Sequence, residues 1–190
     1  MTPSTTTPAA PPVILTADEF IDQFGHTNAE LEAGIVKELP MPGLKHGKIC
    51  LRIGSWILLY VDTHDLGHVM SNDAAVKTKS NPDTIRGADV CYYGYERLPK
   101  GVEVSTRYAE VPPDLVVEVR SPSDRFSDAY TKIGEYLNVG VRAVIYVDPD
   151  TTSATVYRAG ELHQTFHNGD ELTVPDVLPG FSMVVKQLFE

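Results

Sequence analysis

Apolar residues at helical spacing mark one long helix near the start of the chain. It is predicted to run from His46 to about Asp62, with an apolar stripe formed by Ile49, Ile53, Trp56, Ile57 and Tyr60. Three cations, Lys45, Lys48 and Arg52, fall together on the adjacent arc of the same helix. This helix therefore presents an apolar face and a basic face.

Two shorter elements precede that helix. Thr16 can cap a helix that ends at Gly25, because Glu19 follows three positions later as in a capping box. Residues 28–42 have the pattern of a hairpin that turns at Gly34. The chain is thus expected to open with a helix, a hairpin and a second helix.

The stretch PPDLVVEVRSPSDRFSDAYTKIGEYLNVGVRAVIYVDP predicts a strand, a helix and a second strand. The strands span 114–120 and 143–148, and the helix between them makes them parallel with a right-handed crossover. Side chains alternate along a strand, so Leu115, Val117 and Val119 share one face. The opposite face carries Asp114, Val116, Glu118 and Arg120.

The remaining apolar segments complete the predicted sheet. Strands are expected at 68–78 and 88–95, separated by the turn-rich SNPDTIRG, and the segments SATVYRAG, ELHQTFH and ELTVP resemble a β meander. The chain closes with a short helix in VVKQLFE. This order predicts an α/β or α+β fold, in which helices flank a mixed β-sheet with an N-terminal hairpin and a C-terminal β meander.

Length and composition indicate one globular domain. Of 190 residues, 42% are hydrophobic and 22% are charged. The domain is expected over 13–190, and the Thr- and Pro-rich residues 1–12 are expected to form a disordered tail. The sequence lacks a signal-peptide pattern and an apolar run of membrane-spanning length, and its two cysteines, Cys50 and Cys91, have no metal-binding spacing. We therefore predict a cytoplasmic protein with two reduced thiols and no membrane partner.

Glu118 is the first sign of a functional site. A carboxylate in the middle of a buried strand is costly unless a cation or a metal ion compensates its charge. If strand 88–95 lies beside strand 114–120, Asp89 and Glu118 can converge on one divalent cation. Carboxylate oxygens suit Mg²⁺, or Mn²⁺, better than Zn²⁺. The purely structural alternatives are an ion pair of Glu118 with Arg120, and a turn-capping role for Asp89 after Gly87.

Two cations can assist such a metal site. Arg120 shares a strand face with Glu118, whereas Lys132 lies at the edge of the apolar stripe of the following helix. The long side chain of Lys132 can reach over the sheet, although a solvated lysine is the equally simple interpretation.

Seven segments in this order resemble one known family. The segments are GIVKELPMPG with LKHGKI, SNDAAVKT, PDTIRGADVCYYGYERLP, PPDLVVEVRSPSD, TKIGEYLNVGVRAVIYVDP and VLPGF. They are similar to the Uma-two-type restriction-endonuclease family of the PD-(D/E)XK nuclease superfamily, and they cover nearly the whole chain. The resemblance implies a restriction-endonuclease-like fold and metal-dependent hydrolysis of phosphodiester bonds.

The resemblance assigns roles to individual residues. It implies that Asp89 and Glu118 hold the metal, with Ala88 in place of the family's usual proline. The superfamily lysine two positions after the glutamate is Arg120 here, and an arginine cannot transfer a proton as a lysine can. The family's lysine on the next helix corresponds to Lys132, so Asp89, Glu118 and Lys132 are the expected catalytic residues.

Further residues extend this site. Glu38 and His46 match family positions where an additional acidic or polar group can complete the metal shell, and Arg120 is a further candidate. Local phosphate contacts are expected from the cations Lys45, Lys48, Arg52, Arg120 and Arg125.

Two functions follow from these observations. The first is a Mg²⁺-dependent DNA endonuclease, for which a homodimer would suit double-strand cleavage. The second is a nuclease-like fold kept as a non-catalytic binding or assembly module. The formal net charge of −10 favours the second function, because nucleic-acid binders usually carry a basic surface.

Overall fold

The computed structural model describes residues 13–122 and 125–190. The predicted tail at 1–12 lies outside the described residues. The helices are α1 (Ala17–Phe24), α2 (Leu44–His64), α3 (Phe126–Val139) and the 3-10 helix η1 (Val185–Leu188). The strands are β1 (Ala29–Glu32), β2 (Ile35–Glu38), β3 (Gly67–Lys79), β4 (Thr84–Gly94), β5 (Leu115–Val119), β6 (Ala143–Asp148), β7 (Ser153–Tyr157), β8 (Gln164–Phe166), β9 (Glu171–Thr173) and β10 (Ser182–Val184).

The first eight strands form a mixed sheet in which β4 has three partners. β3 pairs with β4 along nearly its whole length, whereas β1 and β5 contact β4 at different ends. β5 and β6 are parallel, as the helical crossover predicted, and the other neighbouring strands are antiparallel. The sheet thus continues from the β1–β2 hairpin through β4 and β5 to β8.

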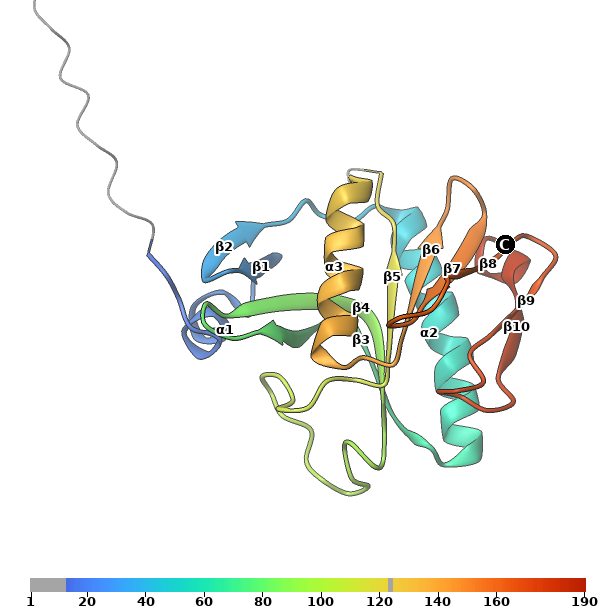
Figure 1. The fold of residues 1–190 in the computed structure, drawn as a ribbon, viewed down its shortest axis with the longest axis horizontal. Coiled ribbons are helices and arrows are strands. Elements are labelled where there is room, and N and C mark those ends of the chain that lie inside the picture. Colours follow the sequence, from blue (N-terminus) through green and yellow to red (C-terminus); the bar gives the residue numbers. More distant parts are fainter. Residues whose placement is uncertain (1–12, 123–124) are drawn as a thin grey trace, which may run out of the picture.

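Helices cover the two faces of this sheet (Figure 1). On one face, α2 packs through Ile49, Ile53, Ile57 and Val61 against β4 to β7, together with the chain after β8. On the other face, Ile133 and Tyr136 of α3 pack against β4, β5 and β6. A smaller core joins α1 to the hairpin through Phe20 and Leu31. This arrangement confirms the predicted fold class.

The helix ends follow from local sequence. Thr16 caps α1 by accepting a hydrogen bond from the Glu19 N–H, and the Glu19 carboxylate accepts one from the Thr16 N–H. These two hydrogen bonds confirm the predicted capping box. The helix ends at Gly25, also as predicted. Gly140 ends α3 in the left-handed region (φ +104°), a conformation that glycine adopts without strain.

Apart from small shifts in the ends of elements, the structure differs from the sequence prediction in two places. The sequence predicts a turn that includes residues 84–87, but these residues belong to β4, which begins at Thr84. The third segment of the predicted meander is also wrong: β7 and β8 pair in the main sheet, but β9 pairs with β10 in a separate two-stranded sheet. Apolar alternation predicts a strand but not its partner. Among the described helices, none combines the length and apolar character needed to cross a membrane.

Candidate active site

A gap lies along one edge of β4, between its contacts with β1 and with β5. β1 pairs with β4 through Leu31 and Ile85, and the β4–β5 ladder begins only at Val90 and Val117. The opposite edge of β4 is occupied by β3. Residues 86–89 therefore border the gap, and polar side chains there accept backbone hydrogen bonds that a neighbouring strand would otherwise accept.

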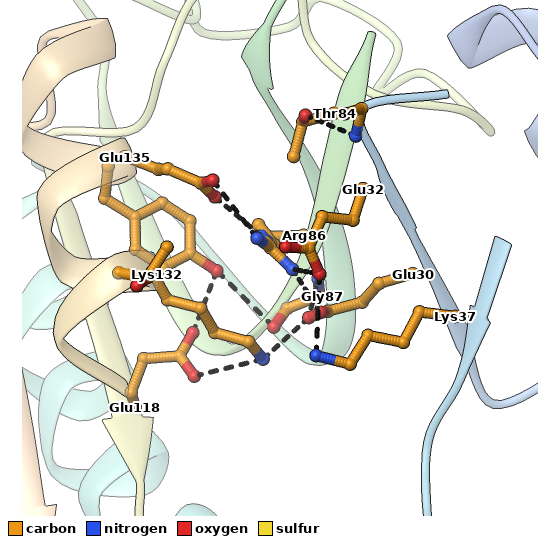
Figure 2. A network of polar contacts seen from close by, with 12 residues as sticks. Glu30, Glu32, Lys37, Thr84, Arg86, Gly87, Glu118, Lys132 and Glu135 are labelled. Carbon is orange, nitrogen blue, oxygen red and sulfur yellow. Dashed lines mark hydrogen bonds and ion pairs between the residues drawn. The ribbon is translucent and has the colours of Figure 1, made fainter. Parts of the chain in front are cut away.

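Arg86 is the centre of the buried charge cluster in this gap (Figure 2). Its side chain is 2% exposed, and its Nη1 lies 3.0 Å from Glu30 Oε2. Its Nε and Nη2 donate to the carboxylate of Glu135 on α3 at 2.6 and 3.1 Å. The Glu30 Oε1 also accepts a hydrogen bond from the Gly87 N–H at 3.2 Å. Arg86 thus connects β1, β4 and α3.

Lys132 joins this cluster to Glu118. Its Nζ lies 2.7 Å from Glu30 Oε1 and 4.0 Å from Glu118 Oε2. The hydroxyl of Tyr136 donates a hydrogen bond of 2.8 Å to Glu118 Oε1. Burial raises the pKa of Glu118 to about 8, opposed by the charge of Lys132 and reinforced by that of Asp89. When Glu118 loses its proton, its protein surroundings therefore compensate the resulting charge only in part.

Asp89 occupies the point where β4 and β5 separate. Its Oδ2 accepts a hydrogen bond of 2.7 Å from the Val119 N–H. The side chain thus continues the link between the two strands beyond the point where their backbone pairing ends. The same oxygen lies 3.4 Å from His46 Nε2 on α2. The hydrogen bond to Asp89 raises the pKa of His46, although burial opposes that shift. Asp89 is thus fixed from both α2 and β5.

Asp73 brings a third carboxylate to this site. Ser71 pairs with Val90 and Ala74 with Ala88, so two residues of β3 bulge opposite Asp89. Both are in the left-handed region, Asn72 with φ +67° and Asp73 with φ +55°. Burial, followed by the charge of Asp89, raises the pKa of Asp73.

These groups line one small pocket of about 80 Å³, whose polar lining residues include Asn28, His46, Asp73, Asp89, Glu118 and Lys132. The donors form an oxygen-rich set, and burial raises the pKa values of Asp73 and Glu118, with the charge of Asp89 adding to both shifts. Such a set fits a hard divalent cation of the Mg²⁺ or Mn²⁺ class. Asp89 and Glu118, with Asp73 beside them, are the residues that would hold it.

The structure brings four of the predicted residues together: His46, Asp89 and Glu118 share the pocket with Lys132. Glu38 instead lies exposed at the end of β2, and the buried glutamate of this hairpin is Glu30.

The other predicted cations contact different groups. Arg120 Nη1 lies 3.2 Å from Asp148 and 2.6 Å from Asp150. On α2, Lys45 donates to the Pro149 carbonyl, Lys48 to the backbone oxygen of Glu190 and Arg52 to the Gln187 carbonyl. Arg125 is exposed immediately before α3.

Sequence reasoning missed Glu30, Asp73, Cys50 and Tyr136. The signal for Asp73 was present, because Ser-Asn-Asp is a turn-type triplet inside a strand pattern. Glu30 carried a weaker signal, because the sequence pattern of the hairpin does not distinguish a buried glutamate from an exposed one.

Comparisons with known proteins match the chain to a family and its fold to a solved structure. The model of the family described as "Putative restriction endonuclease", the Uma-two-type family, matches residues 18–186. The crystal structure of a putative nuclease of the DUF820 family from Anabaena variabilis is similar in fold, with a TM-score of 0.80 and 22% identity over 92% of this chain and 97% of that chain. A DrdV–DNA complex studied by cryoEM aligns with a TM-score of 0.34 and 14% identity over 76% of this chain and 97% of that chain. Among curated proteins, nothing matches the chain.

Replacement of Arg86 by methionine is expected to destabilise the fold by about 3–5 kcal/mol, because Glu30 and Glu135 would both lose the buried guanidinium that pairs with them. Urea denaturation measures this change. Arg107→Met is the matched control: its guanidinium pairs with Asp18 and Asp22 at an exposed site, where such pairs contribute about 0–1 kcal/mol. Equal losses of stability in the two variants would contradict the central role of Arg86.

The raised pKa of Glu118 predicts a pH dependence of stability. Between about pH 4.5 and about pH 8 the folded chain keeps a proton on Glu118 that the unfolded chain has lost. The free energy of unfolding should therefore fall with rising pH through this window, by up to about 1.4 kcal/mol per pH unit. Glu118→Gln removes this contribution, so the wild type should lose stability relative to the variant as pH rises. Denaturation curves at several pH values measure the difference, and parallel pH profiles would contradict the prediction.

Proposed function

We propose a function from the premise that this chain belongs to the Uma-two-type family of putative restriction endonucleases. The proposed activity is hydrolysis of phosphodiester bonds in DNA, dependent on Mg²⁺ or Mn²⁺ and of the PD-(D/E)XK type. In this proposal Asp89 and Glu118 hold the metal ion, and Lys132 assists the attacking water.

One observation carries the proposal: three carboxylates from three neighbouring strands share a single pocket with one lysine. The charge of Asp89 repels the charged forms of both Asp73 and Glu118, and burial strengthens that repulsion. A bound divalent cation would relieve it. When bound, such an ion supplies a more acidic water and offsets negative charge on the phosphate.

Lys132 has the position required of an assisting cation. Burial disfavours its charge, but the neighbouring carboxylates of Glu118 and Glu30 outweigh that effect and raise its pKa. The ammonium group therefore stays protonated, so its role is to orient water or to hold a phosphate oxygen rather than to remove a proton. Glu30 is the positioning residue for Lys132, since their charged atoms lie 2.7 Å apart.

DNA is the proposed substrate, and a homodimer remains a prediction. The cations of α2 donate to carbonyl oxygens of the chain itself. Arg125, exposed at the start of the helix that carries Lys132, is therefore the better placed of the predicted phosphate contacts.

Cleavage of DNA with Mg²⁺ or Mn²⁺ tests the catalytic assignment. Asp89→Asn, Glu118→Gln and Lys132→Met are each expected to lower the cleavage rate by about 10²–10⁴-fold, because each removes a group that binds the ion or orients water. Glu161→Gln is the control, since this carboxylate is exposed in the connection between β7 and β8. Equal rates in all five proteins would identify a contaminating nuclease and overturn the assignment.

The alternative is a nuclease fold that acts as a non-catalytic module, and the net charge of −10 favours it. Thermal unfolding with increasing Mg²⁺ separates the two functions. A metal site should stabilise the folded chain by about 2.7 kcal/mol at a hundredfold excess of Mg²⁺ over its Kd. Glu118→Gln should lose most of this effect. An unchanged melting temperature at millimolar Mg²⁺ would favour the module.

A further inference from the structure

A second group of potential ligands lies on the α2 side of Asp89. His46 and Cys50 stand one helical turn apart on α2, so their side chains point the same way. One ligand atom each from His46, Cys50 and Asp89 lie within 4.8 Å of one another. We infer that these three residues form a site for a thiophilic transition-metal ion such as Zn²⁺.

The distances match a tetrahedral ion. With zinc-to-ligand bonds of about 2.0–2.3 Å, tetrahedral angles place neighbouring ligand atoms about 3.3–3.6 Å apart. The His46 Nε2 to Asp89 Oδ2 distance is 3.4 Å, and the Cys50 Sγ to His46 Nε2 distance is 3.9 Å. The first distance lies within this range, and the second is about 0.3 Å longer, so the Cys50 thiol would move toward His46 when an ion binds.

The surroundings provide support and an open position. The Val119 N–H holds Asp89 Oδ2 at 2.7 Å, and an outer hydrogen bond of this kind orients a carboxylate ligand. His46, Cys50 and Asp89 also border a larger pocket of about 330 Å³ that includes Asp73. Water can complete the coordination from that side, as in sites with three protein ligands.

The donor set separates this site from the proposed magnesium site. A thiolate and an imidazole favour zinc or cobalt, whereas Asp89 with Glu118 offers only oxygen. Asp89 belongs to both sets. If the proposed function holds, an ion on His46 and Cys50 therefore competes for a ligand of the magnesium ion.

Cobalt binding to the full chain without DNA tests the inference. Co²⁺ bound by a thiolate gives an intense near-ultraviolet absorption band, which Zn²⁺ should remove by displacing it. Cys50→Ser should lose this band, and His46→Gln should bind Zn²⁺ at least ~10-fold more weakly. Cys91→Ala is the matched control and should keep the band, because Cys91 is buried in β4 away from this group.

Two results would overturn the inference: no thiolate band in the wild type, or an equal band in Cys50→Ser. Circular dichroism shows whether each variant is folded, and His46→Gln retains the thiol, so a misfolded Cys50→Ser still leaves a decisive comparison. Neither measurement uses cleavage. A chain that binds cobalt but cuts no DNA would contradict only the proposed function, and the reverse would contradict only the zinc site.

Discussion

The charge of Arg86 is the constraint on which this structure depends. A guanidinium keeps its charge at every pH a protein tolerates, so burying it requires carboxylates that cannot move away. Glu30 supplies one from the hairpin, and Glu135 supplies another from α3. Because Glu30 also contacts Lys132, the ion pair that joins these elements sets the position of the proposed catalytic lysine. The stability of the fold and the position of Lys132 are therefore linked through Glu30, which contacts both Arg86 and Lys132.

The fold was largely predictable because its elements obey simple periodicities. The apolar spacing of α2 and the continuous apolar runs of β5 and β6 are local properties of the sequence. A helix between two strands makes them parallel, and this constraint placed Glu118 on the face that α3 covers. The sequence alone does not show that β4 and β5 are neighbours, and the structure confirms this assumption.

The rest of the site depends on contacts that local patterns do not contain. Glu30 and Glu38 lie on paired strands of one hairpin, but only the strand that also pairs with β4 buries a glutamate, Glu30. Asp73 faces the pocket because two left-handed residues bulge from β3, and turn-type residues in a strand predict a bulge only once the strand is known. The pairing of β9 with β10 likewise joins segments that carry no mutual signal.

The separation of β4 from β5 is what allows one aspartate, Asp89, to belong to both proposed metal sites. Were the ladder to continue past Val90, the Val119 N–H would pair with backbone and the Asp89 side chain would not enter the gap. Instead Asp89 faces α2 and α3 at once, with His46 on one side and the carboxylate of Glu118 on the other. An ion on the Glu118 side would weaken the attraction between Glu118 and Lys132, which lie 4.0 Å apart. Glu30 would then hold the lysine alone, so the carboxylate that pairs with Arg86 would also position the ammonium group in the proposed reaction.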